Sequence, residues 1–343
     1  MKNTQKGFSL IEILIALVIG LLTTLVIVQV FSVFEGQKRS TTGTADAQVN
    51  GNIALYNLQR EIQLAGYGLP TFDIANSALL CPTTTTVNAG TVALPVPINL
   101  FPIQITDGGA GTDSISIRYA ANQTAGIPVR VKSLASAVIT VPNALGCAVG
   151  DAILLNSGST CVTTKVTAVS LVANADDTIT LASNTGVVAA QKVSCLGGWS
   201  ETTYRINANQ LERNTAPIVA EIVDIQAQYG ISASAATNAI TAWVDASGTT
   251  WSAPTVTNRN RIKAVRIAVV ARNGLKEKEV VTTACSAENT ANPTGLCAWG
   301  GSAANPAPEL FPKRASPPAG WGNYRYRVYE TIIPLRNMLW SKN

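Results

Sequence analysis

The chain has 343 residues, of which 25 are lysine or arginine and 20 are aspartate or glutamate, so its formal net charge is +5. Only 13% of the residues are charged, and the positive charges are scattered, which argues against a nucleic-acid-binding surface. The absence of histidine excludes a Ser-His-Asp triad, a Cys-His pair and a zinc site with histidine ligands, and we expect neither an enzyme nor a bound metal or cofactor.

The N-terminal segment is a short basic leader, residues 1–7, followed by a long apolar run, residues 8–34. Within that run, residues 13–34 are 22 positions without a charge. As a helix they span about 33 Å, enough to cross the core of a bilayer. A cleaved secretory signal has a shorter apolar core of about 7–15 residues, so we expect this helix to stay in the mature protein. The cysteines that follow favour a cytoplasmic N-terminus and an exported body.

One carboxylate, Glu12, lies near the start of the apolar run. A charged side chain at the centre of a membrane helix costs about 2.5–3.5 kcal/mol and is usually paired. One interpretation is that Glu12 lies among the lipid headgroups and is hydrated. The other is that cleavage after Gly7 makes Phe8 the first residue, and that a new positive amine pairs with the acid.

Residues 35–66 are predicted to form a linker followed by an amphipathic helix. Gly36, Gly43 and several threonines are poor helix formers, which predicts a kink or break near residues 36–44. Helical spacing then returns in one apolar stripe, which consists of Leu55, Leu58, Ile62 and Ala65. Gly66 offers a helix stop. We expect the stripe to pack on the protein's own globular domain.

Residues 67–343 are predicted to form an antiparallel β-rich domain, so the fold class is α+β, with one sheet packed against the N-terminal helix. Nine segments have strand patterns: Ser114–Ala120, Ala137–Val141, Ala152–Asn156, Val162–Leu171, Thr178–Leu181, Thr202–Ile206, Ile218–Tyr229, Ile262–Ala271 and Tyr324–Pro334. Turn sequences such as Asp107-Gly108, Asn207-Ala208-Asn209 and Asn273-Gly274 separate them.

Six cysteines are present: Cys81, Cys147, Cys161, Cys195, Cys285 and Cys297. Their even number and the lack of C-x-x-C spacing favour disulfides in an exported domain over a zinc ribbon or redox motif. Six cysteines allow 15 pairings. We favour Cys285–Cys297, which closes a short loop, and Cys147–Cys161 is a second candidate that spans two strand-like segments.

Three other patterns have a functional and a structural interpretation. Residues 108–115 match a calcium-binding nonapeptide, but one copy cannot stack on itself, so a turn that enters a strand is the default. The loop of residues 285–322 holds Trp299 and Trp321, which serve either a partner contact or a small core for the loop. Glu277 and Glu279 lie in a charged turn, which we expect to be solvated.

The residues Lys6-Gly7-Phe8-Ser9-Leu10-Ile11-Glu12, followed by the apolar helix, resemble the class III signal of type IV pilins and type II secretion pseudopilins. The resemblance implies cleavage between Gly7 and Phe8 by a prepilin peptidase and N-methylation of Phe8. It further implies that Glu12 pairs with the Phe8 amine of a neighbouring subunit during assembly.

Later phrases resemble, in order, the PilW-type minor pilins. They are VNGNIALYNLQREIQLAGYG at 49–68, LERN at 211–214, PIVAEIVDIQAQYGI at 217–231, KAVRIAVVARNG at 263–274 and YRYRVYETIIPLRNMLW at 324–340. The resemblance implies a structural subunit that primes assembly of a type IV pilus, in a tip complex with other minor pilins, the major pilin and a PilY-type adhesin. Such a subunit waits in the inner membrane, engages the assembly platform there and then enters the fibre, which serves adhesion and twitching motility.

Two alternatives stay open. A large minor pseudopilin of a type II secretion system carries the same signal. A permanently membrane-anchored periplasmic adhesin or binding domain with an accidental signal match is the second.

Overall fold

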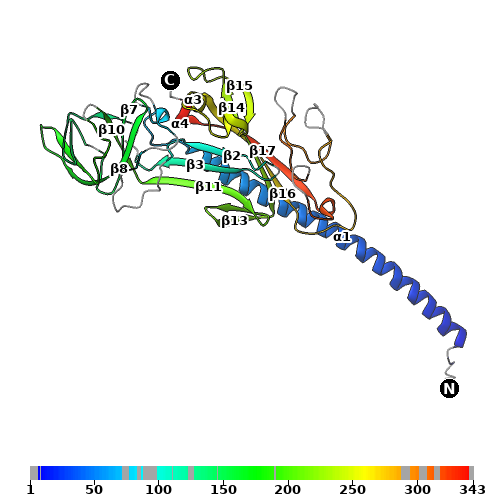
Figure 1. The fold of residues 1–343 in the computed structure, drawn as a ribbon. Helices are drawn as coiled ribbons and strands as arrows, with labels where there is room; N and C mark the ends of the chain where they lie inside the picture. Colours follow the sequence, from blue (N-terminus) through cyan, green and yellow to red (C-terminus); the bar gives the residue numbers. More distant parts are fainter. Residues whose placement is uncertain are drawn as a thin grey trace.

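The computed structural model describes residues 7, 9–71, 77–82, 86–87, 99–109, 111–122, 127–144, 146–188, 191–286, 294–300, 307–312 and 317–339. A single long helix, α1 (Leu10–Gln63), projects from one end of a β-rich body and continues along the body with its second half (Figure 1). Almost all strand pairs are antiparallel, as predicted, and β1 with β8 is a parallel pair. The α+β fold class predicted from the sequence is therefore confirmed.

Two sheets form the body around α1. The four-stranded sheet has the order β15-β14-β16-β17, with bounds Ile240–Asp245, Ile222–Ser232, Ile262–Arg272 and Tyr326–Pro334. The five-stranded sheet has the order β13-β12-β11-β3-β2, with bounds Ala216–Ala220, Gln210–Arg213, Trp199–Asn207, Ser114–Ala120 and Ile103–Thr106. The buried hydroxyl of Tyr229 accepts a hydrogen bond from the Ile105 N–H at 2.6 Å and so joins the two sheets.

The third sheet forms a separate lobe at the end of the body opposite the projecting helix (Figure 1). Its order is β4-β10-β7-β8-β9-β6-β5, with β1 beside β8. The bounds of β4 to β10 are Val129–Arg130, Ser133–Ala135, Val138–Val141, Ala152–Ser157, Thr160–Ser170, Asp177–Leu181 and Lys192–Gly197, and β1 is Thr86–Val87. We call residues 129–197 the distal lobe. It has an apolar core of its own, which includes Ile139, Ile153 and Ile179.

Short helices complete the fold. They are η1 (Ala78–Leu80), α2 (Gly248–Trp251), α3 (Val256–Arg261), η2 (Trp321–Asn323) and α4 (Arg336–Leu339). The chain enters the distal lobe after β3 and leaves it before β11, and these two strands are neighbours in the five-stranded sheet. The Ala121 N–H donates to the Gly198 carbonyl at 2.8 Å, so the two ends of the lobe meet at one stem.

The kink predicted near residues 36–44 is wrong, because α1 is continuous from Leu10 to Gln63. The hydroxyls of Thr41 and Thr44 donate to carbonyls four residues earlier, at 2.9 and 2.7 Å, and remain within the helix. From Gly43 onward the helix is held by its packing on β16 and β17 rather than by its intrinsic propensity.

The helix seat is the stripe of α1 that is buried against the body. It consists of Gly43, Ala47, Gly51, Ala54, Leu58, Glu61 and Ile62. A Cβ at Gly43 or Gly51 would overlap the side chain of Asn273 or Tyr329, so these glycines allow the helix backbone to lie directly on the sheet. The predicted apolar stripe is confirmed, since Leu58, Ile62 and Ala65 are fully buried and Leu55 packs against them.

Gly51→Leu is expected to lower the free energy of unfolding by about 3 kcal/mol, because its side chain must displace the Tyr329 ring from a packed core. The matched control is Gly36→Leu, whose Cβ would meet no atom within 4 Å. It should raise stability by up to about 1 kcal/mol through helix propensity. Urea unfolding of the full chain in detergent measures both. Equal stability of the two variants would contradict the close helix–sheet contact.

Candidate functional site

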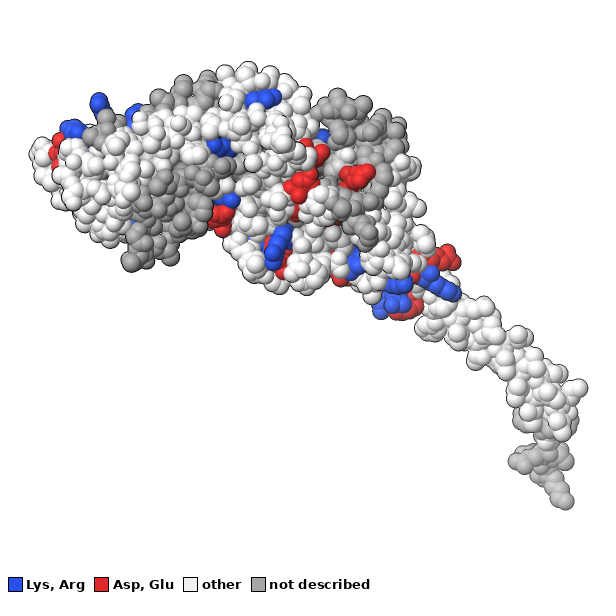
Figure 2. All heavy atoms as spheres, viewed as in Figure 1, with Lys and Arg blue, Asp and Glu red and all other residues white. Residues whose placement is uncertain are grey.

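The first half of α1 is not buried by any other part of the chain that the structure describes. Residues 9–39 are all exposed, although leucine, isoleucine and valine dominate their first two thirds. Within the described residues α1 is the one helix long and apolar enough to cross a membrane, and its spanning window is not covered by the rest of the chain. On the face that Figure 2 shows, no lysine, arginine, aspartate or glutamate is visible along this projecting segment until it reaches the body.

The start of α1 is capped by its own side chains. The Ser9 hydroxyl accepts a hydrogen bond from the Ile11 N–H at 3.4 Å, and the Glu12 carboxylate accepts one from the Ser9 N–H at 3.0 Å. This capping box satisfies amides that a helix N-terminus leaves free, and it places a negative charge at the positive end of the helix dipole. In the single chain Glu12 therefore has a backbone partner rather than a cation.

The predicted processing residues lie directly before this cap. Gly7 is exposed, and Phe8 lies outside the described residues. Cleavage after Gly7 would place the new amine one residue before the Ser9 N–H that Glu12 already accepts. The acid and the predicted amine are therefore neighbours along the chain.

An ion pair that the sequence did not suggest fixes the far end of α1. Arg213 of β12 donates to the Glu61 carboxylate at 3.1 Å, and the hydrogen bond to this carboxylate raises the pKa of Arg213. Glu61 is buried in the helix seat. The two residues are 152 positions apart in the sequence, and both belong to the phrases that resemble PilW.

All six cysteines are paired. Cys285–Cys297 is confirmed. The predicted Cys147–Cys161 pair is wrong, because the structure has Cys81–Cys161 and Cys147–Cys195. The reason is that Cys161 lies in a cluster between the lobe and the body, together with Cys81, whereas Cys147 and Cys195 border the core of the lobe itself.

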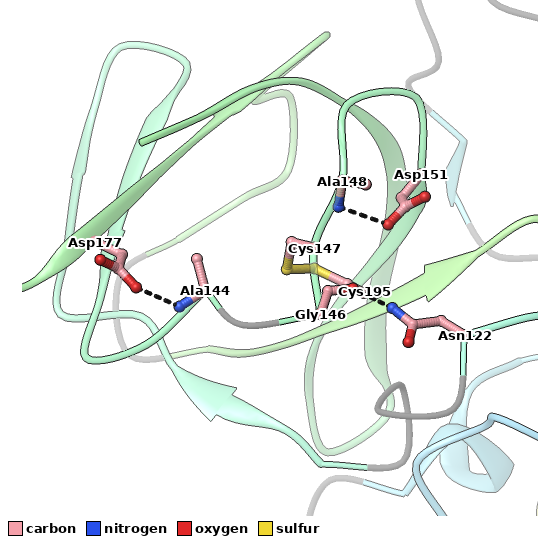
Figure 3. The surroundings of a disulfide bond; sticks show 8 residues. All are labelled: Asn122, Ala144, Gly146, Cys147, Ala148, Asp151, Asp177 and Cys195. Atoms are coloured by element: carbon pink, nitrogen blue, oxygen red, sulfur yellow. Dashed lines mark hydrogen bonds between the residues drawn. A yellow bond between two sulfur atoms is a disulfide. The ribbon is translucent and has the colours of Figure 1, made fainter. Parts of the chain in front are cut away.

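Figure 3 shows the surroundings of the Cys147–Cys195 bond. The Asn122 amide, at the stem of the lobe, donates to the Gly146 carbonyl beside it. In the same region the Asp177 carboxylate accepts hydrogen bonds from the N–H groups of Ala144 and Val172, both at 2.8 Å. These backbone donors lower the pKa of Asp177 below its ordinary value.

Asp177→Asn is expected to make the protein less stable near neutral pH and to reduce the pH dependence of its stability. A lowered pKa in the folded state means that this stabilisation is complete above the pKa in the unfolded state, about 3.9, and is lost as pH falls toward the folded-state pKa. Thermal unfolding at pH 6 and pH 3 measures it. The control, Asp176→Asn, removes an exposed pair with Lys132 and should change little. A wild-type pH profile for Asp177→Asn would contradict the assignment.

The structural interpretations of the other patterns hold among the described residues. Asp113 accepts hydrogen bonds from the N–H groups of Gly108 and Ala227 at 3.0 and 2.9 Å, so its carboxylate joins the turn to β14. Ala110 of the same motif lies outside the described residues. No cluster of three or more potential metal-ligating histidine, cysteine, aspartate or glutamate residues occurs in the described part of the chain.

The tryptophans of the loop that follows β16 pack on the outer face of the four-stranded sheet. Trp321 contacts Phe311 and Tyr326 in one aromatic cluster. Trp299 and Trp243 stack on the Arg266 guanidinium, with centroid distances of 4.2 and 4.9 Å, and burial lowers the pKa of Arg266 to about 10. The small-core interpretation of this loop is therefore confirmed for these residues.

Two family models match the chain. Residues 2–28 match the prokaryotic N-terminal methylation motif, and residues 199–337 match the type IV pilus-assembly protein W, a family of structural pilus components. The second match begins at β11, ends in α4 and leaves out the distal lobe. No curated protein and no solved structure matches the chain. The match at the start of α1 and the match over the sheets on which that helix packs together support a PilW-type prepilin, a membrane-anchored protein in a type IV pilus system.

Proposed function

We propose that the chain is a minor pilin, a structural subunit without enzymatic activity that helps to prime assembly of the pilus and sits in its tip complex. The observation that carries the proposal is the exposed apolar half of α1, which has one carboxylate, Glu12, near its start and then no charge over residues 13–34. Such a segment needs a bilayer before assembly and neighbouring helices after it. The distal lobe extends the opposite end of the body, which suits a subunit with no other subunit stacked above it.

The processing steps belong to the same proposal. Prepilin peptidase cleaves between Gly7 and Phe8, and the Phe8 amine is methylated. In the fibre, Glu12 exchanges the Ser9 N–H for the Phe8 amine of an adjacent subunit. A buried charge that loses its partner is strongly destabilising, so the pair gives a correctly seated subunit an advantage over a misplaced one.

The proposed location is based on the membrane anchor and the disulfides, and the proposed partners are those of a minor pilin. Three disulfides favour a body outside the cytoplasm, since they persist in oxidising compartments. The chain then waits in the inner membrane with its N-terminus in the cytoplasm and its body in the periplasm. Its partners are prepilin peptidase, the inner-membrane assembly platform, the major pilin, other minor pilins and a PilY-type tip adhesin.

Mass spectrometry of the chain recovered from sheared pili tests the proposal. The expected first residue is N-methylated Phe8, and a strain that lacks the chain should display few pili until the full chain is restored. Retention of Met1 in the purified protein would favour a permanently anchored domain. A methylated Phe8 in a deletion strain with normal pili but defective protein secretion would favour a type II secretion pseudopilin.

A further inference from the structure

Charged side chains of both signs gather where α1 leaves the body (Figure 2). On the helix side lie Glu35, Lys38 and Arg39. On the body side lies a segment with the sequence LKEKEVV, residues 275–281, which has two lysines and two glutamates. We call it the basic loop, because one of the glutamates, Glu277, is paired with Arg325 outside the segment. An open groove of about 350 Å³ separates them, lined on one side by α1 residues between Ser32 and Arg39 and on the other by residues 275–278.

The length of the apolar run sets the height of the basic loop relative to a membrane that α1 crosses. Residues 13–34 carry no charge and span about 33 Å as a helix, about the thickness of a bilayer core. When that segment crosses the membrane, Glu35 reaches the outer surface. The basic loop faces the helix at this same level, so it lies among the lipid headgroups of the leaflet that faces the body.

The charges at this level do not cancel within the chain. Glu277 is paired with Arg325 at 3.0 Å. Four exposed cations have no ion pair among the described residues: Lys38, Arg39, Lys276 and Lys278. Two exposed acids, Glu35 and Glu279, also have no ion pair among the described residues. Four minus two leaves an excess of two positive charges in this region.

Apolar side chains flank the lysines. Val280 is 69% exposed, and Leu275 and Val281 are each 37% exposed. Lysine next to exposed aliphatic residues is typical of segments that lie at a membrane surface, because the aliphatic groups enter the interface while the ammonium groups stay with the phosphates. If the basic loop were surrounded by water alone, the exposed side chains of Leu275, Val280 and Val281 would have no apolar surface to contact.

We propose that the basic loop, together with Lys38 and Arg39, is a binding surface for the headgroups of anionic phospholipids. The inference rests on the proposed function, in which α1 anchors the prepilin in the inner membrane. The loop then forms a second contact beside the helix and fixes the height and tilt of the body over the bilayer. Extraction into the fibre has to release this contact.

Hydrogen exchange of the full chain in lipid nanodiscs tests the proposal. Peptides that cover residues 275–281 should exchange about fivefold more slowly in phosphatidylglycerol mixed with phosphatidylcholine than in phosphatidylcholine alone, and added salt should reduce the difference. Lys276→Gln with Lys278→Gln should abolish the difference. Lys132→Gln with Lys165→Gln removes the same charge from the distal lobe and should preserve it.

Residues 13–34 serve as the internal reference in the same samples. Their slow exchange in both lipids shows that the helix is inserted, and fast exchange there would overturn the membrane anchor itself. If the helix is protected and the loop exchanges equally in both lipids, the headgroup surface is wrong. Protection of the loop only in assembled pili would assign it to a neighbouring subunit and would also overturn the proposal.

Discussion

Glu12→Ala is expected to leave the chain processed and membrane-anchored while reducing its recovery in sheared pili by at least about tenfold. Removal of one partner of a buried ion pair costs about 3–5 kcal/mol, and about 1.4 kcal/mol already corresponds to a factor of ten. Quantitative immunoblots of pili and membranes measure the ratio. Glu35→Ala, which removes another exposed carboxylate of α1, is the matched control and should be incorporated normally.

A second variant separates the charge of Glu12 from its capping role. Glutamine at residue 12 can still accept the hydrogen bond from the Ser9 N–H, as in other capping boxes, but it carries no charge. If subunit pairing is the role of the acid, Glu12→Gln fails like Glu12→Ala. Normal incorporation of Glu12→Gln would show that capping of α1 is sufficient, and the pairing hypothesis would be wrong.

Loss of the Cys81–Cys161 disulfide, through Cys81→Ser with Cys161→Ser, is expected to lower the free energy of unfolding by about 4 kcal/mol. The bond joins residues 80 positions apart, and a longer closed loop removes more entropy from the unfolded chain. It also ties the distal lobe to the segment that follows α1, within the cluster between lobe and body. Urea unfolding of the full chain in detergent measures the loss.

The Cys285–Cys297 pair is the matched comparison, since it closes a span of only 12 residues. Its removal should cost about 3 kcal/mol by the same relation. Limited proteolysis adds a local measurement, because the first variant should release the distal lobe as a fragment and the second should not. An equal or larger effect of the Cys285–Cys297 change would contradict the role of Cys81–Cys161 as the tie between lobe and body.

The elements with strong local signals were predictable from the sequence. β3 has the predicted bounds, β16 and β17 lie within two residues of theirs, and Gly66 has the positive φ of 75° that follows a helix end. The predicted strand Ile218–Tyr229 is two strands, because Glu221 adopts a φ of 57° and pairs with Arg272 at 2.7 Å. Arg272 belongs to a strand 51 residues further along the chain, so the sequence around Glu221 does not predict the pairing.

The two wrong predictions, a kink in α1 and a Cys147–Cys161 disulfide, also concern features that depend on distant contacts. The continuity of α1 depends on a sheet that accepts Gly43 and Gly51, and the cysteine pairs depend on which side of the lobe each strand faces. One omission was avoidable, because Ser9-Leu10-Ile11-Glu12 is the sequence signature of a capping box. The position of the basic loop beside α1 also depends on distant contacts, so the local sequence predicted only a charged, solvated turn.

The stem of the distal lobe has a consequence for how such subunits diversify. Ala121 and Gly198 are already hydrogen-bonded, so a short turn between them would close the five-stranded sheet without disturbing the helix seat. Cys81, whose sulfur bonds to the removed part, would need replacement, and so would the apolar residues Leu69, Ala78 and Leu100, which form a buried cluster with the lobe. The lobe is thus an insertion whose two ends meet, and a different insertion at the same stem would leave unchanged the part of α1 that packs on the body.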